Sequence, residues 1–190
     1  MRTKNQIFLL FSCLTFFYSY SQDYGNVQFI ENRGQWDSRV LYMAQVPAGA
    51  IYIHKSGYTI VQHNPQDWEK LYEAGHGHRL NNGAANLPMN NAELKIKSHA
   101  YTVNFLDASS KQQVIADKAI QTRNNYYIGN DPSKWTTDCK IFLGITVKDI
   151  YPNVDIRYYS QSGQVKYDLI AKPGADISKI ALKYDGIEKL

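Results

Sequence analysis

Cysteine is scarce in this chain: only Cys13 and Cys139 occur among 190 residues. Proline is also sparse, with six residues, and the twelve glycines follow no regular period. A disulfide-held small domain and a collagen-like or linker protein are therefore excluded. A disordered tail is excluded as well, because 44% of the residues are hydrophobic and 13% are aromatic. The chain is long enough to bury a hydrophobic core.

A strong charge of one sign is also missing. The 21 basic and 17 acidic side chains give a formal net charge of +4. Two of the basic residues, Arg2 and Lys4, lie in a segment that we expect to be removed. The charge that remains is too small and too scattered to favour a nucleic-acid partner.

Long hydrophobic runs are absent except near the N-terminus. Arg2 and Lys4 precede an apolar stretch at residues 7–17, and Ser19-Tyr20-Ser21 supplies small residues of the kind that flank a cleavage bond. The stretch is shorter than the roughly 20 residues that a membrane-spanning helix needs. We therefore expect residues 1–21 to be a cleaved signal peptide, and the mature protein to be secreted without a membrane span.

A lipoprotein signal at Cys13 is the alternative, but the bulky Phe11 occupies a position where a small residue is usual. Cleavage of the signal would leave Cys139 alone, so no internal disulfide is expected. Cys139 shortly precedes the apolar residues 141–143, and no base lies near it in the sequence. We expect a small buried hydrophobic residue at the start of a strand, not a nucleophile.

Short strand-type runs dominate the rest of the chain, and the fifteen tyrosines favour strands further. The runs lie at residues 40–46, 50–54, 58–62, 100–105, 154–160, 164–171 and 180–184. In the 164–171 run, Lys166 and Asp168 share one face, which Arg157 could also face. The pattern predicts an all-β fold, a two-sheet β-sandwich of about ten short strands.

One stretch, at about residues 65–74, is typical of a short helix. Pro65 opens it, Asn64 can cap it, and Gly75 can end it. From Gly75 to about Glu93 the chain is rich in Gly, Asn and His, which predicts a long surface loop. No repeat or linker divides the chain, so we expect residues 22–190 to form a single domain.

Histidines in this loop are the weak candidates for a metal site. His76 and His78, separated by Gly77, could share a divalent ion, but no acidic or cysteine ligand lies at zinc spacing. His63 and His99 are more typical of ordinary polar residues near strand ends. Four aspartates, at positions 107, 131, 155 and 185, lack the alternating spacing of a calcium loop. We expect no metal and no cofactor.

Catalytic patterns are missing from the sequence. It contains no G-x-S-x-G elbow and no acidic pair that stands out from turn chemistry. Asp131 and Asp176 are expected in turns that bond their own backbone. After the turn at Pro132, we expect the Trp135 indole to lie on the sheet near Tyr127 or Ile128, so that its loss would cost roughly 3–5 kcal/mol.

Seven motifs spread along the chain carry a resemblance. They are residues 29–36 (FIENRGQW), 47–50 (PAGA), 99–105 (HAYTVNF), 124–135 (NNYYIGNDPSKW), 151–159 (YPNVDIRYY), 166–168 (KYD) and 173–176 (PGAD). Together they are similar to the N-terminal β-domain of large exported surface proteins of gliding bacteria with type IX secretion. In that family, the domain commonly precedes β-propeller-type repeats, adhesion-like modules and gliding-motility-associated or sorting C-terminal domains.

The resemblance implies a cell-surface location and structural, not catalytic, roles for the matched residues. These residues are Asn32, Gly34, Trp36, Tyr127, Gly129, Asp131, Pro132, Trp135, Tyr158, Tyr167 and Asp168. Relatives continue into further strands and repeats, so we expect a domain truncated at its C-terminal end near Leu190.

Two functions follow as expectations. The first is a non-enzymatic extracellular module that supports adhesion and contacts other domains or proteins of the cell surface. The alternative is a carbohydrate-binding module that uses exposed aromatic residues, with or without calcium, and takes polysaccharide as its partner.

Overall fold

The computed structural model describes residues 26–76 and 95–187, and most of this part of the chain is β-strand. The strands are β1 (Phe29–Glu31), β2 (Val40–Val46), β3 (Gly49–His54), β4 (Gly57–His63), β5 (Ser98–Phe105), β6 (Gln113–Tyr126), β7 (Thr136–Tyr151), β8 (Val154–Gln161), β9 (Gln164–Ala171) and β10 (Leu182–Asp185). The helices are α1 (Pro65–His76) and the short 3-10 turns η2 (Pro132–Lys134) and η3 (Ile177–Lys179). The expected all-β class is confirmed.

All ten strands belong to one antiparallel sheet with the order β10-β5-β4-β3-β2-β1-β7-β8-β9, and β6 pairs with β7 beside this path. Strand β7 is the junction. It pairs with β6 along most of its length, and β1 and β8 share its other edge. β1 takes residues 141 and 142, and β8 takes residues 144–151. The expected two-sheet sandwich is therefore not confirmed, because a single long strand belongs to both halves of one sheet.

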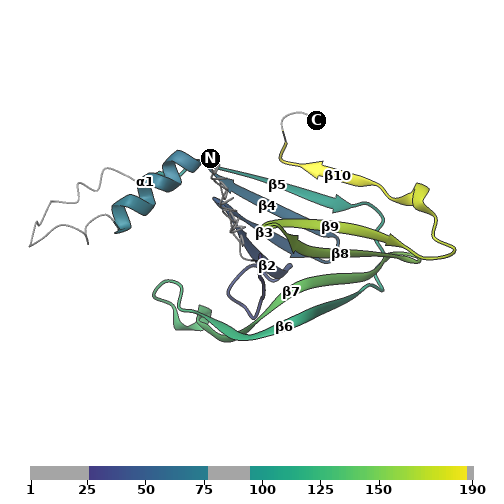
Figure 1. The fold of residues 1–190 in the computed structure, drawn as a ribbon, viewed down its shortest axis with the longest axis horizontal. Coiled ribbons are helices and arrows are strands. Elements are labelled where there is room, and N and C mark those ends of the chain that lie inside the picture. Colours follow the sequence, from purple (N-terminus) through teal and green to yellow (C-terminus); the bar gives the residue numbers. More distant parts are fainter. Residues whose placement is uncertain (1–25, 77–94, 188–190) are drawn as a thin grey trace, which may run out of the picture.

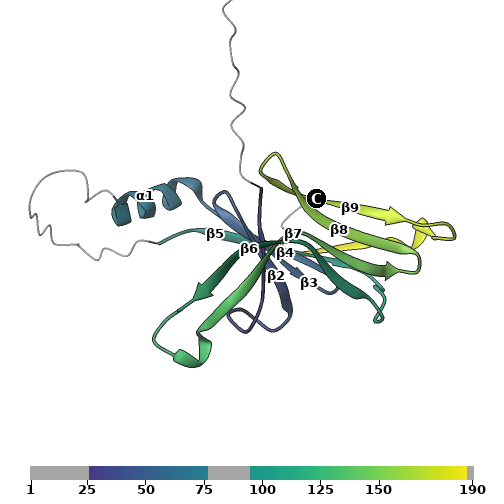
Figure 2. The same ribbon diagram turned by 60° about the horizontal axis from the view of Figure 1, so that its bottom comes forward.

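The sheet curls, so that its two halves face each other across the main core (Figures 1 and 2). Strands β2–β5 supply residues such as Ile53 and Val103 from one side. Strands β7 and β8 supply Ile145 and Ile156 from the other. All four side chains are fully buried, which gives the hydrophobic drive for the curl.

A second, smaller cluster lies beside the first half of β7, outside the main core. Cys139 and Ile141 are buried there with Ile30, whereas Ile145 and Val147, at positions of the same parity, face the main core. β7 thus changes the face that it turns to the core as it passes from β1 to β8. The expected burial of Cys139 is confirmed, and that burial raises the pKa of its thiol.

Gly144 lies where β7 makes this change. A Cβ at this position would collide with Asp117 Oδ1. Asp117 Oδ2 accepts a hydrogen bond from Arg157 at 3.0 Å, so the missing side chain of Gly144 gives room to an ion pair between β6 and β8.

The expected strands are mostly confirmed, and the pairing of β8 with β9 places Arg157 opposite Asp168, on the side that Arg157 was expected to face. The long hairpin of β6 and β7 was not predicted as such, since only short pieces of it look strand-like in sequence. Helix α1 is confirmed, but it projects away from the sheet (Figures 1 and 2). Its Trp68 stacks on His63 with the ring centroids 5.1 Å apart. Most of the expected loop after Gly75 lies outside the described residues.

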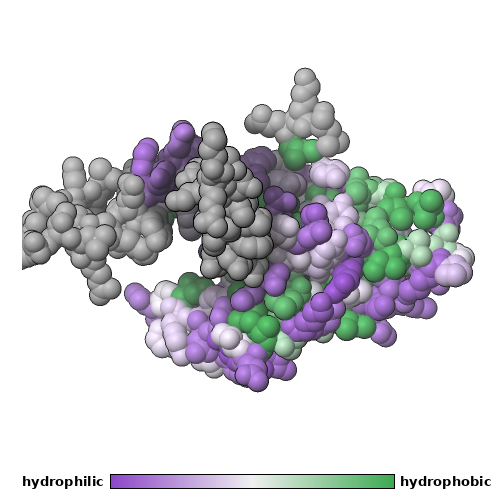
Figure 3. Space-filling view, in the orientation of Figure 1, coloured by the Kyte–Doolittle hydropathy of each residue, from purple (hydrophilic) through white to green (hydrophobic). Residues whose placement is uncertain are grey.

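The surface of one face is mixed in character (Figure 3). Hydrophobic surface gathers at the right of the view, over the end of β9 and the segment that follows it. Ile170 of β9 and Ile177 of η3 are exposed. Within residues 26–76 and 95–187, no helix is long and apolar enough to cross a membrane.

Gly144→Ala is expected to lower the free energy of unfolding by about 1–3 kcal/mol, because the added methyl group collides with the Asp117 carboxylate. In an Asp117→Ala background the same change should cost clearly less. Urea unfolding of the two single variants and the double variant measures this coupling. Equal costs in the two backgrounds would contradict the steric explanation.

Candidate functional site

Asn32 organises the loop between β1 and β2. Its amide nitrogen donates to the carbonyl oxygens of Asp37 and Val40 at 2.9 and 2.8 Å. Its side-chain oxygen accepts hydrogen bonds from the backbone N–H groups of Gly34 and Trp36 at 3.0 and 3.2 Å. Gly34 has a φ of 115°, which favours glycine. One side chain thus fixes the path of the whole loop.

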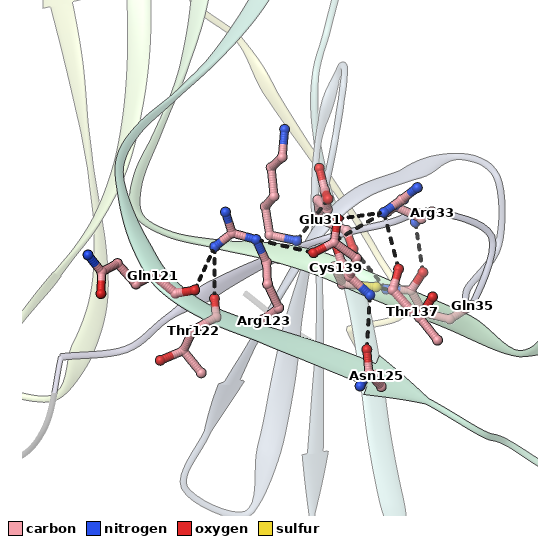
Figure 4. Close-up of polar contacts among 11 residues, drawn as sticks. Glu31, Arg33, Gln35, Gln121, Thr122, Arg123, Asn125, Thr137 and Cys139 are labelled. Atoms are coloured by element: carbon pink, nitrogen blue, oxygen red, sulfur yellow. Dashed lines mark hydrogen bonds and ion pairs between the residues drawn. The ribbon is translucent and has the colours of Figure 1, made fainter.

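The same loop is bound to the start of β7 by Arg33 and Gln35 (Figure 4). Arg33 donates to the carbonyl oxygens of Thr137 and Asp138, both at 3.1 Å. Gln35 donates to Glu31 O at 2.8 Å and contacts the Cys139 sulfur at 3.4 Å.

Asp138 adds charge to this network, since its carboxylate lies 3.6 Å from Arg33 and 3.5 Å from Arg123 of β6. All three side chains are at least one-third exposed, so each ion pair contributes little by itself. The loop is therefore held against β7 mainly by the hydrogen bonds of Arg33 and Gln35, with the ion pairs as an addition.

Trp36 anchors this loop on the second cluster. Its ring meets Tyr126 edge-on at 5.2 Å and Tyr52 at 6.4 Å between centroids. Such aromatic pairs contribute beyond simple burial. The motif at residues 29–36 therefore places the loop beside the outward face of β3.

An open groove of about 780 Å³ lies between this loop and the outward face of β3, β4 and β5. Its floor is formed by alternate residues of these strands, those that point away from the main core. The lining includes Tyr52, His54, Thr59, Thr102 and Asn104, with Asp37 and Arg39 at the loop side.

The groove combines fixed and free polar groups. Thr59 and Thr102 share a hydrogen bond of 2.8 Å, and Arg39 forms a two-point ion pair with Asp37, with both contacts at 3.0 Å. That pairing lowers the pKa of Asp37 to about 2. In contrast, the Tyr52 hydroxyl and the His54 ring hydrogen-bond to no other described residue.

The surroundings of His54 favour the neutral form of its ring. Burial lowers the pKa of its imidazole, and the nearby charge of Arg39 lowers it further. A neutral imidazole has one nitrogen that donates and one that accepts, so the groove offers both kinds of group to a ligand.

The tip of the β6–β7 hairpin is a second exposed feature. Tyr127, Ile128 and Trp135 are 63%, 50% and 44% exposed. The expected contact of Trp135 with Tyr127 is present, because their rings meet edge-on at 5.7 Å. However, the indole does not lie on the sheet, so the expected cost of 3–5 kcal/mol for its loss is too high.

This tip is held in a defined shape. Asp131 caps η2 by accepting hydrogen bonds from the backbone N–H and the hydroxyl of Ser133 at 3.0 and 2.7 Å. Pro132 opens the turn, and Trp135 Nε1 donates to Gly129 O at 3.2 Å. Gly129 has a φ of 67°. The predicted turn at Asp131 is confirmed, and Asp176 forms the matching turn with Ser178.

Tyr158 and Tyr167 lie between the two halves of the sheet. Each ring contacts Tyr58 of β4, at 6.1 and 5.8 Å between centroids. Burial strongly raises the pKa of Tyr158. Asp168 instead lies on the surface, where its carboxylate accepts a hydrogen bond from Tyr159 at 3.3 Å.

Asp155 is the one charged residue that is buried in the described part of the chain. Its carboxylate accepts hydrogen bonds from Lys148 at 2.8 Å, Lys172 at 2.9 Å and the Asp149 N–H at 3.0 Å. Burial alone would raise the pKa of Asp155, but these bonds outweigh it and lower the pKa to about 2. A fully paired carboxylate of this kind ties β7, β8 and the end of β9 together.

The structure covers the weak metal candidates His76 and His78 only in part. His76 is the last residue of α1, and His78 lies outside the described residues. His63 is bonded to Ser98, with 2.7 Å between the ring and the hydroxyl. Within the two described ranges, no group of three His, Cys, Asp or Glu side chains could hold a metal ion.

The fold and these surfaces define an all-β domain with an outward groove and an exposed aromatic tip. Residues 29–190 match the sequence family described as Domain of unknown function (DUF7948), so the chain belongs to this family. No curated protein and no solved structure matches the chain.

The groove was missed in the sequence because its members are common polar residues on three separate strands. One signal was present: the alternation in residues 100–105 already separates Thr102 and Asn104 from the core-facing side chains. The same alternation, applied to residues 50–54 and 58–62, selects Tyr52, His54 and Thr59.

The two tryptophans of the motifs are expected to differ in their contribution to stability. Trp36→Ala should cost about 2–3 kcal/mol, because it removes a half-buried ring from the second cluster. Trp135→Ala should cost at most about 1.5 kcal/mol, which is the value of one exposed aromatic pair. Urea melts of both variants measure the difference, and equal costs would contradict the placement of these rings.

Asp155→Asn is expected to cost about 3–5 kcal/mol at pH 7, since it leaves two lysines without their buried partner. The pKa of Asp155 is lower in the folded protein than in the unfolded chain. Ionised Asp155 therefore stabilises the folded state fully at a pH above the pKa that it has in the unfolded chain. This stabilisation is lost as the pH falls from about 4 to about 2. Urea unfolding at pH 7 and pH 3 should therefore show a smaller difference between wild type and variant at pH 3. The exposed Asp107→Asn serves as the control, within about 0.5 kcal/mol of wild type at both pH values.

Proposed function

We propose that this protein is a non-enzymatic extracellular module of an exported cell-surface protein, and that it supports adhesion through the aromatic tip of the β6–β7 hairpin. The partner is a protein surface with an apolar pocket. The observation that carries the proposal is the exposure of Tyr127, Ile128 and Trp135 together at one end of the molecule.

The shape of the tip favours a protein partner. The Tyr127 and Trp135 rings are perpendicular, with an interplanar angle of 90°, so they form a wedge and not a flat platform. Ile128 adds an aliphatic side chain. Aromatic anchors that fill pockets account for much of the energy in protein interfaces.

The stiffness of the tip supports the same conclusion. Asp131, Pro132 and the bond from Trp135 to Gly129 hold the turn before any partner binds. A surface that is already ordered loses less conformational entropy on binding. The exposed apolar side chains of this turn can therefore bind a partner without first becoming ordered.

The cell-surface location in this proposal comes from the sequence. Residues 1–21 have the composition of a signal peptide, and the motifs resemble domains of exported surface proteins. The two facing halves of the sheet give the domain a layered, sandwich-like core that needs no disulfide.

A bead assay tests the adhesive role. Beads that carry the mature chain should bind washed envelopes of the source cells, and a Tyr127→Ala/Trp135→Ala variant should reduce the bound fraction at least tenfold. Ile177→Ala is the matched control, because Ile177 is 68% exposed but lies away from the tip. Binding that is lost with Ile177→Ala and kept in the tip variant would assign adhesion to the β9 end and contradict the proposal.

The second expected function, carbohydrate binding, is favoured by a different observation. The outward groove combines an aromatic ring in its floor with free polar groups, whereas the two rings of the tip are perpendicular and form no flat surface.

A further inference from the structure

We propose that the outward groove of β3, β4 and β5 binds a short stretch of a neutral polysaccharide. This inference rests on the second candidate function and is independent of the tip. A polysaccharide needs an open site, since its chain continues at both ends. The groove is open and, at about 780 Å³, falls in the upper part of the roughly 300–1,000 Å³ found for ligand sites.

Tyr52 provides the surface for a sugar ring. It lies among the groove lining, and Trp36 holds it by an edge contact with the centroids 6.4 Å apart. An aromatic ring has an apolar face that suits the C–H face of a pyranose and a polar hydroxyl that suits its rim. The Tyr52 hydroxyl has no hydrogen-bond partner among the described residues, so it remains free for a ligand.

The other polar groups suit sugar hydroxyls. The neutral His54 ring can donate and accept. Asn104 presents an amide from β5, which makes one long contact of 3.3 Å to Asp185. The imidazole and the amide can each donate and accept a hydrogen bond, and a sugar hydroxyl can do the same.

The charge of the groove points to a neutral ligand. Arg39, one of the cations of the lining, is paired at two points with Asp37. Lys55, which also lines the groove, forms no ion pair with any described residue. An anionic polymer would meet one free positive charge and the Asp37 carboxylate, which is a poor site for repeated acidic groups.

The groove is also organised before binding. Asn32 fixes the loop that carries Asp37 and Arg39, and the Thr59–Thr102 bond fixes the floor. Neither set of bonds has to break for a ligand to enter.

Affinity electrophoresis of the mature chain tests the inference. Native gels that contain a neutral polysaccharide (laminarin, xylan or galactomannan) should retard the protein in at least one case. Tyr52→Ala should weaken the apparent affinity at least tenfold. Thr59→Arg, which fills the groove from its floor without touching the main core, should do the same. Thermal melts of each variant establish that it is folded.

Trp135→Ala is the matched aromatic control and should leave the retardation unchanged. This separates the groove from the tip, so that failure of one proposal leaves the other standing. Retardation that survives both groove variants, or disappears with Trp135→Ala, would overturn the inference. So would the absence of retardation in all three neutral gels, or retardation only in alginate that high salt removes.

Discussion

The structure depends on one strand having two neighbours on the same edge. β7 is 16 residues long, which leaves room for β1 on its first half and β8 on its second. Each half of the sheet would otherwise end in an open edge at this point. Because β7 continues through both, the two halves must turn toward each other, and the main core fills the space between them.

Both candidate surfaces follow from this arrangement. The paired ends of β6 and β7 extend beyond β1, and their turn carries the aromatic tip. The start of β7 also supplies the backbone carbonyls that receive Arg33, so the groove wall is attached to the same strand. A change at residues 137–139 would therefore alter the position of the loop that borders the groove.

The sequence predicted most strands, the helix and the turns at Asp131 and Asp176, because their signals are local: alternation, caps and turn residues. It did not predict the single sheet, since nothing local indicates that the three-residue strand β1 pairs with residues 141 and 142 of β7. It also placed Trp135 on the sheet. The turn that brings Trp135 back to Tyr127 is local, but whether other elements cover the pair depends on tertiary packing, and none of the described elements does.

The pairing of β1 has a consequence for how the chain folds. β2 to β5 pair largely with their sequence neighbours, and so do β6 to β9, so each group can form early from local contacts. Joining them requires Ile30 to meet Ile141, which closes a loop of more than one hundred residues. In a chain that becomes available for folding from its N-terminus onward, β1 could pair with β2 early. Its other edge would stay unpaired until β7 became available. The final docking of the two groups, and not the formation of either, is the step expected to limit the rate of folding.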